Sequence, residues 1–93
     1  MSIYGVNRMC HQLMHDKNFR YRMQTVPEQV VAELDLSEDE RRLVLAGEVG
    51  ELYLRGANAF LLGYLTRFEI LGLTLPVYNR RMRAVAGIEP AVV

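Results

Sequence analysis

Two histidines are the first residues in this 93-residue sequence whose spacing suggests chemistry. His11 and His15 are four residues apart, so on a helix both imidazoles would face one side and could share a metal ion. Cys10 or Asp16 stands next to them as a possible further ligand. A metal site needs ligands from elsewhere too, and the sequence has no second cluster of His, Cys or paired carboxylates. We therefore predict no metal site, and interpret both histidines as surface or partner-facing residues.

No catalytic nucleophile or acid–base pair is predicted. Cys10 shares a helix face with Met9 and Leu13 instead of standing at a helix start, where a thiolate would be stabilised. It is interpreted as a buried structural thiol. The carboxylates of residues 38–40 fall in the first turn of an expected helix, where the helix dipole favours acidic side chains.

A small basic cluster is the remaining candidate for binding. It consists of Arg80, Arg81 and Arg83 with Arg67, near Tyr78. Guanidinium groups suit a carboxylate or the acidic residues of a partner, whereas the alternative is an ordinary solvated helix face. We predict Tyr78 and Arg81 as partner-binding residues.

Composition and charge exclude several classes of function. Apolar residues make up 51% of the chain, enough for one compact core but not for two. Lys plus Arg and Asp plus Glu both number 11, so no net charge attracts nucleic acid or an anionic membrane. The longest apolar run falls well short of the ~20 residues that span a bilayer, and no secretory signal is recognisable. With a single cysteine, these features predict a cytoplasmic protein without an internal disulfide.

Apolar residues recurring at three- and four-residue steps predict an all-α fold, a small irregular domain of five to seven short helices. The expected helices cover residues 3–15, a segment from Asp16 to about Thr25, 27–33, a segment from Ser37 to Gly47, 48–54, 57–68 and a last helix after Thr74. We expect residues 1–93 to form a single domain, with 84–93 as a flexible tail because Gly87 and Pro90 interrupt the pattern.

Side chains that can cap helix ends mark several of these boundaries. Ser37 and Glu40 match the Ser-x-x-Glu capping box, and Gly47 is placed to end the same helix in a left-handed conformation. Asp16 can cap the second helix and Thr74 the last one.

The segment Leu54-Arg-Gly-Ala-Asn-Ala-Phe-Leu-Leu resembles a known family. It is similar to the Gly-Gly-Asn-x-[Tyr/Phe]-x-Leu segment in the small (alpha, LigA-type) subunit of protocatechuate 4,5-dioxygenase, a two-subunit extradiol ring-cleavage enzyme. Gly56 and Asn58 fit this motif, while Ala57 replaces a glycine.

Three further segments resemble the same family in the same order, so the resemblance covers the chain from about Val6 to Met82. They are Met9–Met23, the capped helix of Leu36–Ala46, and Gly72-Leu-Thr-Leu-Pro-Val-Tyr-Asn-Arg-Arg-Met. The sequence departs from the family in having no long N-terminal arm and a shorter connection between Leu65 and Gly72.

The resemblance implies that this chain serves an enzyme without performing the chemistry. In the family, a larger subunit holds ferrous iron on two histidines and one glutamate and cleaves the ring of a catecholic acid. The small subunit binds no cofactor and covers the mouth of that active site, which excludes water. The residues that the resemblance places near the substrate are Asn58, Phe60 and Phe68.

Two other functions remain open. The chain resembles helical recognition domains that bind another enzyme, such as the precursor peptides of backbone N-methyltransferases, with Ala84–Val93 as the modified tail. A free-standing homodimer is the second alternative, because five Met and no Trp favour an adaptable apolar surface that a second copy would cover.

Overall fold

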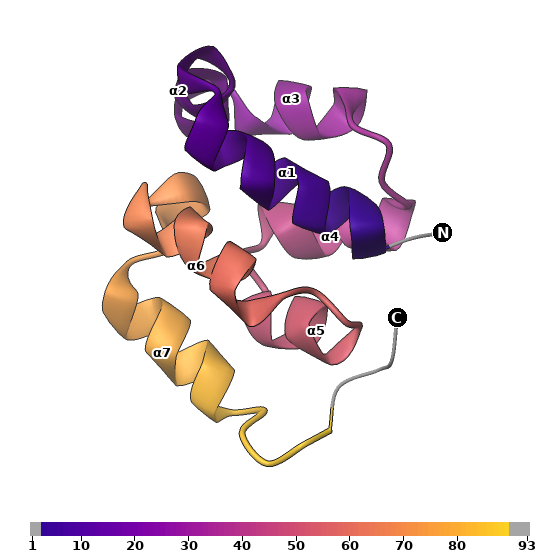
Figure 1. Cartoon of the computed structure of the whole chain (residues 1–93), viewed down its shortest axis with the longest axis vertical. Helices are drawn as coiled ribbons and strands as arrows, with labels where there is room; N and C mark the ends of the chain where they lie inside the picture. The colour runs from indigo at the N-terminus through magenta and orange to yellow at the C-terminus, as the bar shows by residue number, and fades with distance from the viewer. Residues whose placement is uncertain (1–2, 90–93) are drawn as a thin grey trace.

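The structure is a computed structural model that describes residues 3–89 of the chain. Seven α-helices and one 3₁₀ turn follow one another (Figure 1): α1 (Ile3–His15), α2 (Lys17–Thr25), α3 (Pro27–Glu33), α4 (Glu38–Leu45), α5 (Val49–Leu54), α6 (Ala59–Arg67), η1 (Ile70–Gly72) and α7 (Leu75–Arg83). The described part of the chain contains no strand, which confirms the predicted all-α class with short helices. No helix within residues 3–89 has both the length and the hydropathy to cross a membrane.

The predicted caps form at three of four helix ends. Asp16 Oδ1 accepts a hydrogen bond from Phe19 N at 3.0 Å and starts α2. Ser37 and Glu40 form both hydrogen bonds of a capping box at the start of α4. Gly47 has a φ of 68° and follows the last turn of α4, the left-handed conformation that suits glycine. Thr74 occupies the N-cap position of α7, but its side chain makes no cap hydrogen bond, so this detail of the prediction is wrong.

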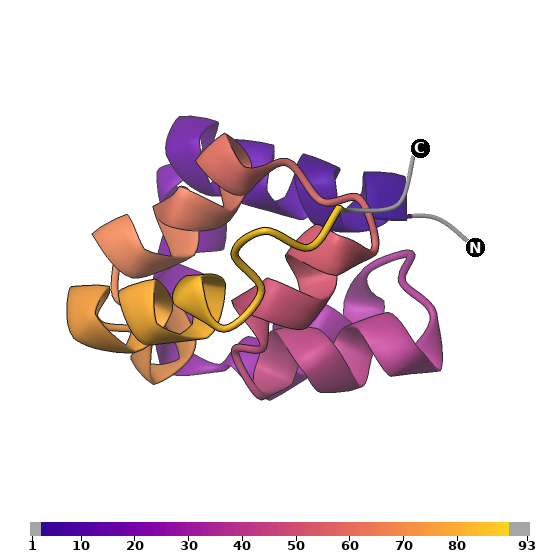
Figure 2. The same cartoon turned by 90° about the horizontal axis from the view of Figure 1, so that it is seen from below.

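Contacts between consecutive helices arrange the chain as a closed path (Figures 1 and 2). Helices α1 to α5 each pack against the next one, and α5 then packs against both α6 and α7. Helix α6 also lies against α1, so the first helix contacts a segment from the second half of the chain. Helix α6 therefore contacts α1, α5 and α7, and this central position agrees with its apolar sequence.

One continuous cluster of apolar side chains fills the interior. Phe19 of α2 belongs to it and is 6% exposed. In α6 the buried residues are Leu62 and Leu65, whereas Phe60 is 73% exposed. The helical spacing of apolar residues in this segment would place Phe60, and not Leu62, on the buried side of the helix. Because α6 is apolar on several sides, its sequence does not identify the side that faces the core.

Residues 84–87 continue from α7 as turns, and residues 88–89 have no regular structure. Val85 is buried there and packs close to Gly50 of α5. The rest of the predicted tail, residues 90–93, lies outside the described residues, so the flexible tail stays a prediction.

Candidate functional site

The first predicted substrate-proximal residue, Asn58, begins α6. Its side-chain oxygen accepts a hydrogen bond from Leu61 N at 3.1 Å, which makes it the N-cap of the helix. Its own backbone N–H donates to Asn7 Oδ1 of α1 at 2.8 Å. Asn58 therefore ties the start of α6 to α1, and its side-chain oxygen is occupied by the helix.

Phe60 lies in the first turn of α6 with most of its ring exposed. The ring packs edge-on against Tyr64, with 5.6 Å between the centroids. The next residue, Leu61, forms one wall of an open groove of about 510 Å³, whose other walls come from α1. The α1 residues lining this groove include Tyr4, His11 and His15. We call the surface formed by Tyr4, His11, His15, Phe60 and Leu61 the α1–α6 face.

Both histidines lie on this face with exposed side chains. Their rings are 4.4 Å apart between centroids and tilted by 41°. Within residues 3–89 no group of three or more His, Cys, Asp or Glu side chains is placed to hold a metal ion. Tyr4, which is 65% exposed, was not among the residues predicted from the sequence. Its position seven residues before His11 is the signal that places it on the same side of α1.

Phe68 lies just beyond the C-terminal end of α6 and is half-buried between arginines. The guanidinium of Arg20 stands 4.2 Å from the ring centroid and that of Arg67 5.9 Å from it. Arg20 Nε also donates to the carbonyl of Leu13 at 3.1 Å, and the carbonyl of Phe68 accepts from Gln24 at 3.2 Å. This stacking between α2 and the end of α6 has no signal in the sequence.

The backbone after Phe68 adopts an unusual conformation. Glu69 and Leu71 have φ values of 50° and 62°, in the left-handed region that non-glycine residues rarely occupy. Two such residues within three positions produce a tight turn between α6 and α7. Their conformations carry a local cost of about 1–3 kcal/mol each, which the surrounding packing offsets.

Tyr78 of α7 lies beside the start of α6. Its hydroxyl donates to the carbonyl of Ala59 at 3.2 Å. Burial raises the pKa of Tyr78 above its ordinary value, and an electrostatic contribution from the nearby Cys10 side chain acts in the same direction. Tyr78 therefore remains protonated at neutral pH and holds α7 against α6.

Arg81 binds the C-terminal end of α4. Its Nη1 donates to the carbonyls of Ala46 and Gly47 at 3.1 and 2.7 Å, and its Nε lies 3.6 Å from a carboxylate oxygen of Glu48. A guanidinium is well suited to this position because the last carbonyls of a helix lack partners and carry partial negative charge. Of the predicted basic cluster, Arg81 is thus bound at α4 while Arg67 lies beside Phe68.

Cys10 is a buried thiol, as predicted. Its side chain is 0% exposed, and burial raises the pKa of the thiol to about 12. Since the thiolate is the reactive form, the structure gives this residue no nucleophilic role at neutral pH.

The predicted site residues therefore fall into separate places on the molecule. Asn58, Phe60 and Tyr78 meet at the start of α6. Phe68 lies eight residues after Phe60, which is about 12 Å along the helix axis at a rise of 1.5 Å per residue. Arg81 belongs to the contact between α7 and α4.

Comparison with known protein families gives one match. Residues 6–84 match the family described as aromatic-ring-opening dioxygenase LigAB, LigA subunit. No curated protein and no solved structure matches the chain. The matched segment runs from the first turns of α1 to the end of α7 and includes nearly all of the described core. The chain therefore belongs to the LigA family, the small subunit of aromatic-ring-opening dioxygenases.

Proposed function

We propose that this chain is a non-catalytic accessory subunit of an Fe(II)-dependent extradiol dioxygenase that acts on a catecholic acid in the cytoplasm. The iron, on two histidines and one glutamate, belongs to a larger partner chain, and this chain binds no cofactor. Membership of a family defined as one subunit of a two-part enzyme is the main support. Breakdown of aromatic compounds is the process in which the pair would act.

The observation that carries the docking proposal is the exposure of Phe60 beside the groove. An aromatic ring that is 73% exposed is typical of a residue that becomes buried in a complex, and the next residue in the chain, Leu61, lines the groove. Tyr4 adds a second exposed ring to the same surface. The α1–α6 face is thus the proposed contact with the catalytic chain.

The rings at the two ends of α6 are the proposed contributors near the substrate. Phe60 would seal the edge of the partner's active site, and Phe68 would face the bound aromatic ring. Such apolar contacts exclude water from a reactive oxygenated intermediate. The proposed roles of Tyr78 and Arg81 in partner binding depend on their hydrogen bonds to Ala59 and Gly47, which fix the position of α7 beside the face.

Co-purification from the native cell tests this function. The tagged chain is used to recover partners, which are identified by mass spectrometry, and the eluate is assayed for iron and for catechol-dependent oxygen uptake. We expect a larger chain with iron and oxygen uptake. Recovery of a methyltransferase would overturn the proposal in favour of a recognition domain, and recovery of this chain alone, self-associated and without metal, would favour a homodimer.

A matched pair of variants tests the docking surface in the same assay. Phe60→Ala removes the exposed ring of the α1–α6 face and should reduce recovery of the larger chain. Leu75→Ala removes an apolar side chain of α7 that is 60% exposed and should leave recovery unchanged. Equal recovery with both variants would place the interface elsewhere.

A further inference from the structure

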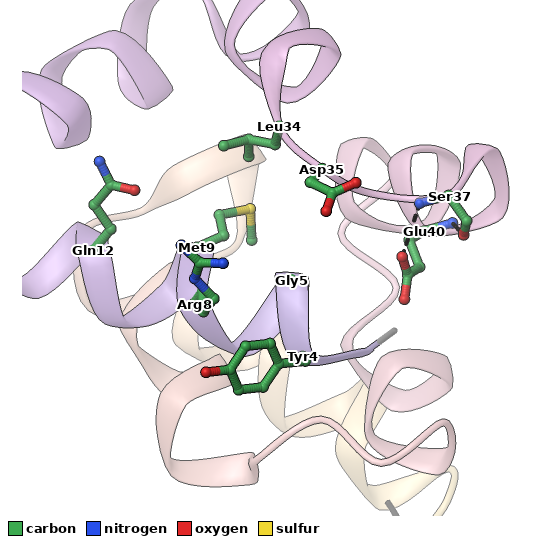
Figure 3. Close-up of a pocket in the computed structure, with 9 residues that line it drawn as sticks. All are labelled: Tyr4, Gly5, Arg8, Met9, Gln12, Leu34, Asp35, Ser37 and Glu40. Atoms are coloured by element: carbon green, nitrogen blue, oxygen red, sulfur yellow. Dashed lines mark hydrogen bonds between the residues drawn. The ribbon is translucent and has the colours of Figure 1, made fainter. Parts of the chain in front are cut away.

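A second cavity lies next to the groove, between α1 and the start of α4 (Figure 3). It has a volume of about 210 Å³, the size of a small organic group. Its walls come from α1 between Tyr4 and Gln12, the connection between α3 and α4, and the first turn of α4. Met9 and Leu34 supply apolar wall, while Asp35, Glu40 and Arg8 supply charge.

The close approach of α1 to this connection depends on Gly5. A Cβ atom at Gly5 would stand 2.6 Å from the carbonyl oxygen of Asp35 and 3.0 Å from the Leu36 side chain. Both separations are shorter than van der Waals contact, so the sequence provides a glycine where the two segments meet. The cavity is therefore bounded by a fixed contact on this side.

Glu40 is the group that gives the cavity its chemistry. The residue is 1% exposed, and one carboxylate oxygen, Oε1, accepts the backbone N–H of Ser37 at 2.9 Å. The other oxygen, Oε2, is buried and has no hydrogen-bond partner among the described residues. The capping box at the start of α4 uses only Glu40 Oε1 and the Ser37 hydroxyl, so Oε2 is not needed to cap this helix. A buried carboxylate oxygen without a donor is unfavourable, and a donor that reaches Oε2 from the cavity, which Glu40 lines, would satisfy it.

The charges around the cavity indicate the kind of donor. Two of the nine lining residues are acidic and one is basic. Arg8 forms no ion pair with either acid in the described residues; its guanidinium lies 5.8 Å from the ring centroid of Tyr4. Figure 3 shows the carboxylates of Asp35 and Glu40 on the same side of the space, opposite Tyr4 and Arg8. The balance favours a positively charged donor over an anion or a neutral hydroxyl.

We propose that this cavity binds a small organic cation, an ammonium or guanidinium group, which donates to Glu40 Oε2 and lies against the Asp35 carboxylate. The cation comes either from a free amine or from a lysine or arginine side chain of a partner protein. Both sources present the same group to Glu40. The cavity shares Tyr4, Arg8 and Gln12 with the neighbouring groove, so a partner on the α1–α6 face would lie next to its mouth.

Binding is measured on the full chain by ¹⁵N–¹H NMR titration with propylammonium and methylguanidinium chlorides, with tetramethylammonium chloride at equal ionic strength as the control. We expect saturable shifts of the amides near Gly5, Ser37 and Glu40 with the first two cations. Tetramethylammonium has the charge but no N–H donor and should produce none. Absence of saturable shifts with propylammonium and methylguanidinium, or equal shifts with all three salts, would overturn the proposal.

Two variants locate the site. Glu40→Gln removes the charge but keeps the capping box, because glutamine is accepted at this position, so the helix remains intact. We expect its affinity for both cations to fall about tenfold or more, as expected for loss of a charge-assisted hydrogen bond. Glu38→Gln neutralises an exposed acid in the same turn of α4 and should bind as the natural chain does. An equal loss in both variants would show a general charge effect and contradict the site.

A comparison of blocked and free amines separates the two sources. The blocked residues are N-acetyl-lysine and N-acetyl-arginine methylamides, and the free cation is propylammonium. If the blocked residues bind at least as tightly, the site accepts a basic side chain of a partner; if only the free cation binds, the site accepts a small molecule. Failure of all of them to bind refutes the cavity proposal without affecting the dioxygenase-subunit proposal, which is tested by co-purification.

Discussion

The residues of this chain with possible chemistry are mostly used to hold the fold together. Asn58 caps α6, Arg81 binds the end of α4, and Tyr78 connects α7 to α6. Cys10 is enclosed in the core. Phe60 and Glu40 differ from these four, since one is an exposed ring and the other has an unpaired buried oxygen. At the scale of single residues, these two therefore point most directly to binding.

Cys10 should resist thiol reagents while the protein is folded. With a pKa raised to about 12, its thiolate fraction at pH 8 is far lower than that of an ordinary cysteine. We expect labelling by a neutral alkylating agent at pH 8 to be about a thousandfold slower in the native protein than in denaturant. Because the chain has one cysteine, the labelling rate reports this site alone. Comparable rates in both states would mean that the site opens to solvent easily.

At the scale of helices, most boundaries rest on bonds between residues close in sequence. The end of α4 shows this well: Glu48 N donates to the Leu43 carbonyl and Gly47 N to the Val44 carbonyl, both within one turn. The same pair of bonds recurs after α5, where Ala57 N donates to Leu52 and Gly56 N to Tyr53. Short helices of six to nine residues depend on such ends, because they contain few internal hydrogen bonds.

Ser37 and Thr74 occupy the N-cap positions of α4 and α7 and should differ in their contribution to stability. Ser37→Ala removes the hydroxyl that accepts the Glu40 N–H at 3.1 Å, and should lower the free energy of unfolding by about 1 kcal/mol. Thr74→Ala is the matched control because the Thr74 side chain makes no cap hydrogen bond, so its effect should stay within about 0.5 kcal/mol. Urea unfolding followed by circular dichroism measures both. Equal losses would contradict the cap assignment.

Two helical glycines should respond in opposite directions to alanine. At Gly63 in α6 the nearest atom outside the helix backbone to an added Cβ is the Tyr78 hydroxyl oxygen at 4.0 Å, so the gain in helix propensity should stabilise the protein by about 0.5–1 kcal/mol. At Gly50 in α5 the added Cβ would stand 2.8 Å from the Arg81 carbonyl oxygen. We expect Gly50→Ala to destabilise the protein by about 1–3 kcal/mol, because α7 must move away. Thermal unfolding distinguishes them, and stabilisation by both would show that α5 and α7 are further apart.

At the scale of the whole molecule, α6 presents its two aromatic ends to different surroundings. Phe60 lies at the α1–α6 face and Phe68 between Arg20 and Arg67 near α2. A subunit that covers an active site has to perform two tasks, docking and closure. In the proposed role, the separation of the rings along α6 would allow docking and closure to be changed independently.

Phe60→Ala and Phe68→Ala should therefore affect the assembled dioxygenase differently. Phe60→Ala should raise the concentration of this chain needed for half-maximal oxygen uptake by about tenfold or more, since a buried aromatic contributes roughly 1.5–3 kcal/mol. Turnover should recover at saturating concentration. Phe68→Ala should instead change KM or kcat for the catecholic acid even at saturation. The reverse pattern would exchange the proposed roles of the two rings.

The sequence determined the positions of the helices and several of their caps. Asp16, Ser37 and Glu40 predicted helix starts correctly because capping joins atoms three residues apart, and the repeated apolar spacing of α1 predicted its buried side. The family was also recognisable from ordered motifs, and its match over residues 6–84 confirms it. Local patterns were sufficient for these features since each depends on neighbours within one or two turns.

Tertiary packing decided which faces and side chains remain available for binding. Arg81 binds a carbonyl 34 residues away in sequence, and Gln24 binds Phe68 across 44 residues. The burial of Leu62 instead of Phe60, and the cavity closed by Gly5 against Asp35, likewise depend on which helices meet. Apolar periodicity shows that a helix buries one side, but in a helix as apolar as α6 the choice of side is made by the helices packed against it.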